Sequence, residues 1–259
     1  MVHVGCLAGL LAAAASLASA RTPPGFTPAT TTELIVEYNG FVAQSGAVVP
    51  RNSMLCFTYP FLLGYANTPP ATIPQPRIGT LARLTGQSYA VFMIDLDIPT
   101  NNPPATNTLL HWLQTGLTPA AQATRLNTTT GQVSVFLLEN STNTAPITAY
   151  FGPNPPARIP LSHRYTQILV DTSTLDTNGL NSLRTAAATI IGFNAQTVLG
   201  QLGLADKVVA GNFYNVTNPG PVNGTGMGPG GPVATAGVGR VGPAVGMVIA
   251  LAGVLMMAF

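Results

Sequence analysis

Two carboxylates and two histidines are the residues of this chain best suited to chemistry. Asp95 and Asp97 stand two positions apart in the segment DLDIP, and beyond the first twenty residues the only histidines are His111 and His163. Two carboxylates at this spacing on a strand share a face and repel each other unless a donor or a positive charge meets them. A carboxylate beside an imidazole also raises the pKa of that imidazole. We therefore expect the two acids to meet donor groups, and the two histidines are the candidates.

The acids come at the end of a segment that has the pattern of a central strand. In residues 89–97, Phe92, Ile94 and Leu96 fall on one face, while the alternate positions fall on the other. Both faces are apolar until Asp95, so we expect this strand to be covered on both sides. The two carboxylates then emerge where the strand ends.

The rest of the chain between residues 21 and 222 predicts one domain dominated by strands. Short segments rich in β-branched and aromatic residues are bounded by turn residues. They are ELIVEY (33–38), MLCFTY (54–59), YAVFMID (89–95), VSVFLLE (133–139) and YTQILVD (165–171). We expect only two helices, at 180–191 and 195–202, with Asn194 as the N-cap and Gly203 as the C-terminal stop of the second.

Charge excludes one class of partner. The 259 residues carry 10 Lys and Arg and 8 Asp and Glu, for a formal net charge of +2. A nucleic-acid-binding surface needs clustered basic side chains to neutralise phosphates. No such cluster is visible, so nucleic acid is not an expected partner.

Both ends of the chain have the composition of targeting segments. Residues 1–20 are apolar and end in ASA, which is typical of a secretory signal peptide; a buried helix is the alternative. Residues 223–240 are rich in Gly and Pro and predict a flexible stalk. Residues 241–259 are uncharged and predict either a removed signal for a GPI lipid anchor or a membrane anchor. We expect a secreted, cell-surface protein. The candidate anchor sites are Asn223, Gly230 and Ala234.

Secretion is also consistent with the sequons and with the cysteine count. Four Asn-x-Ser/Thr sequences are candidate glycosylation sites: Asn127, Asn140, Asn215 and Asn223. After removal of residues 1–20 one cysteine remains, Cys56, so an intramolecular disulfide is not expected. We interpret Cys56 as a buried thiol, with a reactive nucleophile as the alternative.

Four ordered motifs resemble the phosphatidylethanolamine-binding protein family. They are DLDIP, LHW, YFGPNPP and HRY, and the likeness runs from about residue 33 to residue 216, including LGLADKVVAGNFYNV near its end. It resembles the secreted, GPI-anchored fungal members of that family. One departure is Leu96, because the family has a proline between the two acids; this puts the placement of Asp97 in question.

The resemblance implies a mainly β fold and a small pocket. The fold would be a single domain of antiparallel sheets in a Greek-key-like arrangement with a few peripheral helices. The pocket would bind phosphate-like groups, such as a phosphorylethanolamine head group, with Tyr150 nearby and the Gly152 amide exposed to the anion. Its lining residues would be Asp95, Asp97, His111, Gly152, Pro153, His163 and Tyr165.

Three functions remain open at this point. The first is a non-catalytic binding protein at the cell surface, which the resemblance implies; a protease, such as a carboxypeptidase, or a signalling protein is then a further expected partner. The second is a structural protein of the surface or cell wall whose pocket is a relic. The third is a metal-assisted hydrolase, but the ligands lack a close metal-binding spacing and no G-x-S-x-G places a nucleophile. We therefore expect no enzyme activity, no metal and no cofactor.

Overall fold

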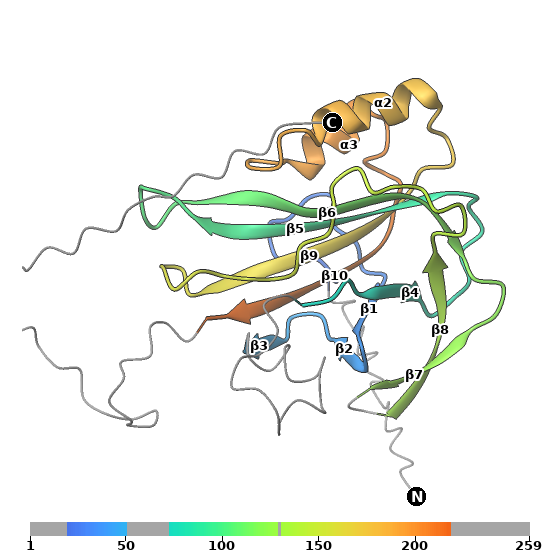
Figure 1. Ribbon diagram of the computed structural model, residues 1–259, viewed down its shortest axis with the longest axis horizontal. Coiled ribbons are helices and arrows are strands. Elements are labelled where there is room, and N and C mark those ends of the chain that lie inside the picture. Colours follow the sequence, from blue (N-terminus) through green and yellow to red (C-terminus); the bar gives the residue numbers. More distant parts are fainter. Residues whose placement is uncertain (1–19, 51–72, 129–130, 219–259) are drawn as a thin grey trace, which may run out of the picture. The chain divides into compact units, whose positions relative to one another are not determined.

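The chain folds mainly into β-strands. The structure, a computed structural model, describes residues 20–50, 73–128 and 131–218 (Figure 1). Its strands are β1 (Ile35–Tyr38), β2 (Phe41–Ala43), β3 (Val48–Pro50), β4 (Arg77–Thr80), β5 (Tyr89–Pro99), β6 (Thr106–Pro119), β7 (Thr124–Thr128), β8 (Gly131–Glu139), β9 (Ser162–Asp171) and β10 (Val208–Thr217). Its helices are α2 (Thr177–Ala186) and α3 (Ala195–Gln201).

The strands form one mixed sheet in which β5 is central. The order is β2-β1-β4-β8-β6-β5-β9-β10-β3, and β7 pairs with β8 outside this path. β10 and β3 pair in parallel, whereas the other neighbouring strands are antiparallel. β5 has long antiparallel partners on both edges, β6 and β9. The predicted mainly β fold with peripheral helices is confirmed.

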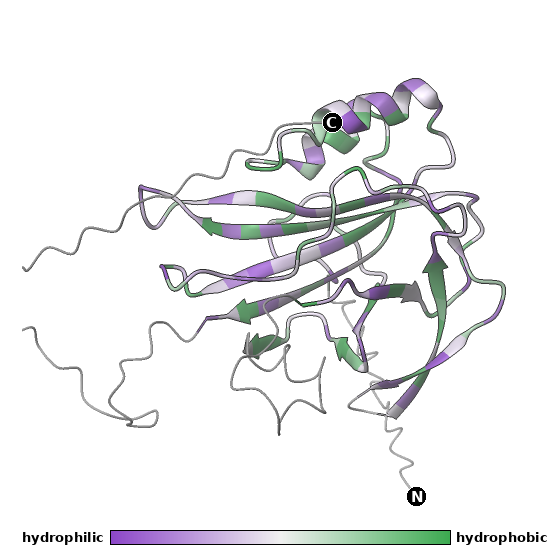
Figure 2. Ribbon diagram, in the orientation of Figure 1, coloured by the Kyte–Doolittle hydropathy of each residue, from purple (hydrophilic) through white to green (hydrophobic). Residues whose placement is uncertain are grey.

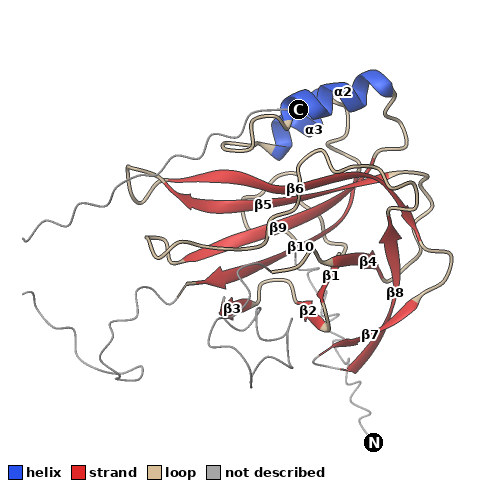
Figure 3. Cartoon of the chain, viewed as in Figure 1, coloured by secondary structure: helices blue, strands red, loops and turns tan. Residues whose placement is uncertain are grey.

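The two faces of β5 pack into different parts of the core. Val91 and Met93 belong to a cluster that also contains side chains of β1, β4, β9 and β10. Phe92 and Ile94 belong to a second cluster, which α2 and α3 complete. Figures 1 and 3 show both helices on this second side of the sheet, and Figure 2 shows apolar residues running along the central strands. The expectation that β5 is buried on both faces is therefore confirmed.

The helix predictions are correct in kind and partly correct in extent. Asn194 is the N-cap of α3, since its side chain accepts a hydrogen bond from the Thr197 N–H. Gly203 follows the helix with a φ of +68°, a conformation that glycine adopts without strain. α2 begins and ends earlier than predicted, and Asp176 caps it by accepting from Gly179 N.

The strand predictions find the cores of β1, β5, β8 and β9, and they miss the other strands that the structure describes, which are β2, β3, β4, β6, β7 and β10. The predicted strand at 54–59, with Cys56, lies outside the described residues. β6 has the sequence TNTLLHWLQTGLTP, in which polar residues interrupt the alternating pattern. This miss matters because β6 carries His111.

Candidate functional site

Three neighbouring strands bring four of the predicted residues together. Asp95 lies near the end of β5, His111 on β6, and both His163 and Tyr165 on β9. Asp95 is paired directly with Tyr165 across the β5–β9 ladder. Because side chains alternate along a strand, His163 and Tyr165 share one face of β9. The site is thus built on the rigid centre of the sheet.

Asp95 and His163 form a buried ion pair. The Nδ1–H of His163 donates to Asp95 Oδ2 at 2.8 Å, and His163 Nε2 lies 3.1 Å from the Pro160 carbonyl oxygen. A neutral imidazole has one N–H, so only the imidazolium form can donate to both acceptors. Neither side chain is more than 2 % exposed. Both ring nitrogens of His163 therefore face acceptors, and the ring is held beside Asp95.

His111 is different, because its Nε2 is buried and has no hydrogen-bond partner among the described residues. Its Nδ1 lies 2.8 Å from the Phe151 carbonyl oxygen, an acceptor, which places the proton of the neutral ring on Nδ1. Nε2 then carries a lone pair and lies 3.9 Å from Asp95 Oδ2, too far for a hydrogen bond. Two acceptors thus face each other across a gap.

The charge on His111 corrects one expectation from the sequence. Burial lowers the pKa of His111 below its usual value, and the positive charge of His163 acts in the same direction. The Phe151 carbonyl and Asp95 oppose this shift without reversing it. The acids were expected to charge both histidines. Instead Asp95 is matched to His163, and His111 stays neutral at pH 7 because desolvation outweighs its weaker contact with the same carboxylate.

Aromatic rings enclose His111. The Phe151 ring lies on it with centroids 3.9 Å apart, and Tyr165 meets it edge-on at 5.2 Å. The Tyr165 hydroxyl accepts a hydrogen bond from Asn154 N at 3.2 Å. Burial, followed by the charge of Asp95, raises the pKa of Tyr165 far above its usual value, so its hydroxyl stays protonated.

Asp97 is bound by Arg164 and not by either histidine. Its Oδ2 accepts from both the backbone N–H and the Nε–H of Arg164 at 2.8 Å, and its Oδ1 accepts from Nη2 at 2.7 Å. Each acid therefore has its own cation, as the repulsion between two close carboxylates requires. Leu96 does not disturb this arrangement. Because Arg164 binds Asp97, the negative charge of Asp97 is balanced without the histidines.

Gly152 and Pro153 belong to the loop beside the site rather than to its described polar contacts. A Cβ on Gly152 would lie 2.8 Å from the carbonyl oxygen and 2.9 Å from the Cβ of Ile73. Glycine is thus needed there for close packing. Exposure of the Gly152 amide to an anion stays a prediction. Pro153 is buried. The sequence analysis missed Phe151 and Pro160, whose backbone carbonyls form hydrogen bonds with His111 and His163 respectively. Every residue has a backbone carbonyl, so the residue type does not indicate this role.

Comparison with known proteins identifies the family. The family model for phosphatidylethanolamine-binding proteins matches residues 15–214. The chain belongs to the phosphatidylethanolamine-binding protein family. A curated relative is the phomoidride biosynthesis cluster protein N of the fungus Talaromyces stipitatus. It is 27% identical over 214 residues, and the match covers 78% of this chain and 92% of the relative.

The chain also matches solved structures. A carboxypeptidase Y inhibitor, solved in complex with its cognate proteinase, is 16% identical with a TM-score of 0.44, and the match covers 73% of this chain and 84% of the inhibitor. A phosphatidylethanolamine-binding protein from Plasmodium vivax is also 16% identical with a TM-score of 0.44, over 74% of this chain and 87% of that one.

Three of the four sequons lie in described residues of this family member and differ in accessibility. Asn127 is exposed on β7. Asn140 is half-buried, and its amide both accepts from Thr144 N and donates to Thr144 O. Asn215 lies in β10 between β9 and β3. Asn223, the stalk and both terminal segments lie outside the described residues.

No group of three or more His, Cys, Asp and Glu side chains is arranged to hold a metal ion in residues 20–50, 73–128 and 131–218. Within those same ranges, no helix is long and apolar enough to span a bilayer.

Proposed function

We propose that this chain is a non-catalytic binding protein whose Asp95–His111–His163 site takes a phosphate-type head group together with one proton. The observation that carries this proposal is the buried, unpartnered Nε2 of His111. Leaving a buried polar atom unsatisfied costs about 1–3 kcal/mol, which a ligand that completes the hydrogen bond would recover. The ligand class is inorganic phosphate or a phosphate monoester such as phosphorylethanolamine.

The proton is required because the two atoms facing each other are both acceptors. His111 Nε2 and Asp95 Oδ2 are 3.9 Å apart, and a fully deprotonated anion would be repelled by both. A phosphate monoester has a second pKa of about 6, so near neutral pH it can carry a P–OH that donates to Nε2. Transfer of that proton gives an imidazolium that donates to a phosphate oxygen, with the same total charge. Binding and uptake of one proton are thus coupled.

The hydrogen bonds that the neighbouring groups already make favour binding over catalysis. Both ring nitrogens of His163 are engaged in hydrogen bonds, with Asp95 and with the Pro160 carbonyl, so neither is free to serve as a general base. Asp97 is held by Arg164 through three hydrogen bonds. A hydrolase would need a second acid or base beside His111, and these two candidates are already engaged. Metal-dependent hydrolysis and a purely structural role are the alternatives that the experiment below separates.

The proposal extends to location and partners. An apolar leader, a Gly- and Pro-rich stretch and an apolar C-terminal segment support secretion and display at the cell surface through a lipid anchor. A protease or a signalling protein is a further proposed partner, through a surface distinct from the head-group site. Neither point depends on the geometry of the site.

The test is calorimetric titration of the full chain with phosphate and with phosphorylethanolamine at pH 5.5 and pH 8. We expect saturable binding at pH 5.5 that is at least tenfold weaker at pH 8, because His111 and the phosphate then share no proton. His111→Gln should lose the binding. Arg158→Gln removes an exposed positive charge from the neighbouring loop and should keep it.

Three results would contradict the proposal. They are equal affinity at the two pH values, unchanged binding in the His111→Gln variant, and no binding by the folded wild type, which would favour the structural role. Turnover of a phosphate ester that requires an added divalent metal would support the hydrolase instead.

A further inference from the structure

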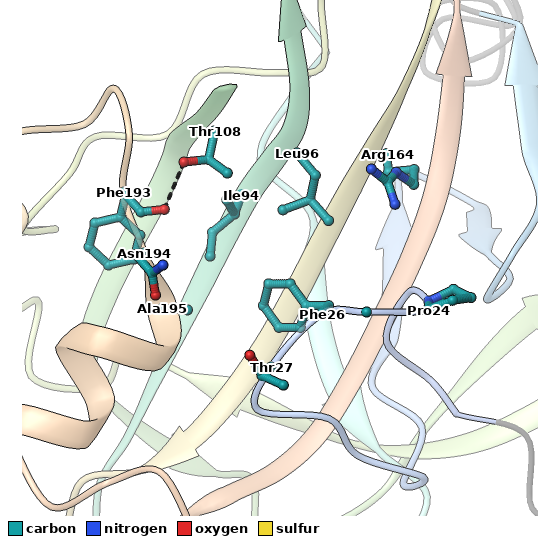
Figure 4. Close-up of a pocket in the computed structure, with 11 residues that line it drawn as sticks. Pro24, Phe26, Thr27, Ile94, Leu96, Thr108, Arg164, Phe193, Asn194 and Ala195 are labelled. Atoms are coloured by element: carbon teal, nitrogen blue, oxygen red, sulfur yellow. Dashed lines mark hydrogen bonds between the residues drawn. The ribbon is translucent and has the colours of Figure 1, made fainter. Parts of the chain in front are cut away.

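A cavity lies on the face of the sheet opposite to Asp95. It has a volume of about 380 Å³ and is lined by residues of the segment 24–27, of β5, β6 and β9, and of the start of α3 (Figure 4). Ile94 and Leu96 project into it from β5. Because side chains alternate along a strand, these two residues point away from the face that carries Asp95. The cavity is therefore distinct from the proposed head-group site.

One part of the cavity wall is apolar, and polar side chains make up the rest. Ile94 and Phe193 are 1 % and 4 % exposed and belong to the cluster beneath the helices. Leu96 and Phe26 are half-buried and pack against the same cluster. Figure 4 shows Phe193 to one side of Ile94 and Phe26 to the other. An apolar group placed between the two phenyl rings would rest on Ile94 and Leu96, which favours an aromatic or branched aliphatic body.

Arg164 is the charged residue among the cavity's lining side chains. Its Nε and Nη2 donate to Asp97, whereas Nη1 makes no hydrogen bond within the described part of the chain. The bonds to Asp97 raise the pKa of Arg164, so the guanidinium stays charged. A guanidinium has five N–H donors and no acceptor. The Nη1 group can therefore only donate to a ligand.

The other polar groups around the cavity fit the same conclusion. The Thr108 hydroxyl donates to the Phe193 carbonyl at 2.8 Å, and the Thr27 hydroxyl donates to Gln196 Oε1 at 2.7 Å. The side-chain oxygen of Asn194 caps α3, which leaves its amide NH₂, again a donor. A ligand that fits both the walls and these donors must present an acceptor.

From these features we infer that the cavity binds a small apolar molecule that ends in a carbonyl or carboxylate oxygen. The aromatic or branched body lies between Phe26 and Phe193, and the oxygen accepts from Arg164 Nη1. The volume is near the lower end of the range of about 300–1,000 Å³ that is usual for small-molecule sites, so the ligand is compact. This function does not rest on the head-group site.

The test uses three probes of similar size that differ at one end: phenylacetamide, phenylacetate and 2-phenylethylamine. Each is titrated into the full chain while ¹H–¹⁵N correlation spectra are recorded. We expect phenylacetamide or phenylacetate to shift the amides of residues 25–27, 94–96 and 193–195 in a saturable way. The amine, which carries donors only, should bind at least tenfold more weakly. Tighter binding of phenylacetate assigns an acid as the natural end group, and tighter binding of phenylacetamide a neutral carbonyl.

Two variants locate the binding. Leu96→Trp fills the cavity and should weaken binding of the better probe at least tenfold. Leu81→Trp, a matched change at an exposed leucine that lines a different cavity, should leave it unchanged. If Leu96→Trp fails to fold, Phe26→Ala removes a wall from the half-buried segment and should weaken binding too. Equal binding of the amine, no shift of the named amides with any probe, or unchanged binding in the folded variants would overturn the inference.

Discussion

Replacing Asp95 with asparagine should destabilise the fold strongly, because it removes the counter-ion of a buried imidazolium. Asp95 is 2 % exposed and His163 is 0 % exposed. Removing one partner of a buried ion pair typically costs about 3–5 kcal/mol. Asparagine keeps one oxygen that can accept from His163 Nδ1 or from Asp97 N, and such a hydrogen bond is worth about 1 kcal/mol. We therefore expect a loss of about 3 kcal/mol in the free energy of unfolding at pH 7.

The matched variant is Asp97→Asn, which has the same chemistry in a more exposed pair. The Arg164 side chain is 38 % exposed, so water screens the charge that is left behind. The asparagine oxygen still accepts from the Arg164 backbone N–H, and we expect a loss of about 1 kcal/mol. The two variants thus differ in burial more than in the number of hydrogen bonds.

Urea unfolding monitored by the fluorescence of Trp112, the single tryptophan and a buried one, measures both losses. The slope of the free energy against urea should be equal in the two variants, so that the midpoints report stability. A loss below about 1 kcal/mol for Asp95→Asn would refute the buried ion pair, since it is below the usual range for such pairs. A loss in Asp97→Asn equal to that in Asp95→Asn would do the same.

Three further predictions test other parts of the account. Gly152→Ala should lower the free energy of unfolding by about 1–3 kcal/mol, because the new Cβ meets Ile73. Gly200→Ala in α3 should raise it by about 0.5–1 kcal/mol, because the new Cβ there meets open space. Urea midpoints measure both changes. Burial lowers the pKa of His111, so as the pH falls the unfolded chain takes up this proton before the folded chain does. The free energy of unfolding should therefore decrease below about pH 6.5, and His111→Gln should remove this part of the pH dependence. In a glycosylating host, Asn127→Gln should abolish a glycan mass shift and Asn140→Gln should not, since the Asn140 amide is hydrogen-bonded to Thr144 on both sides; the reverse pattern would contradict this.

The part of the fold that could be predicted from the sequence is the part that local pattern determines. β5 alternates between two apolar faces, and the structure buries Val91 and Phe92 in different clusters, as that pattern requires. The N-cap of α3 was predicted because Asn194 satisfies a free N–H within its own turn. β6 was missed because its partners, and not its own alternation, make it a strand.

The sequence predicted which residues meet at the site better than it predicted which of them bind each other. The sequence indicated that Asp95, His111 and His163 meet, but the partner of each acid depends on how β5, β6 and β9 are aligned. That alignment gives His163 to Asp95 and Arg164 to Asp97. The neutral state of His111 follows from burial that many distant residues create together. No single motif contains that information, which is why the expectation of two charged histidines was wrong for His111.

The central claim is that His111 binds a phosphate-type ligand by sharing a proton with it. The most direct measurement is the titration of the His111 ring by NMR, with and without saturating phosphorylethanolamine. In the free protein the midpoint should lie below the usual histidine value of about 6.5, since burial lowers the pKa of His111. With ligand the midpoint should rise above the free value, because binding stabilises the protonated pair. A midpoint that is unchanged by a saturating ligand would contradict the account.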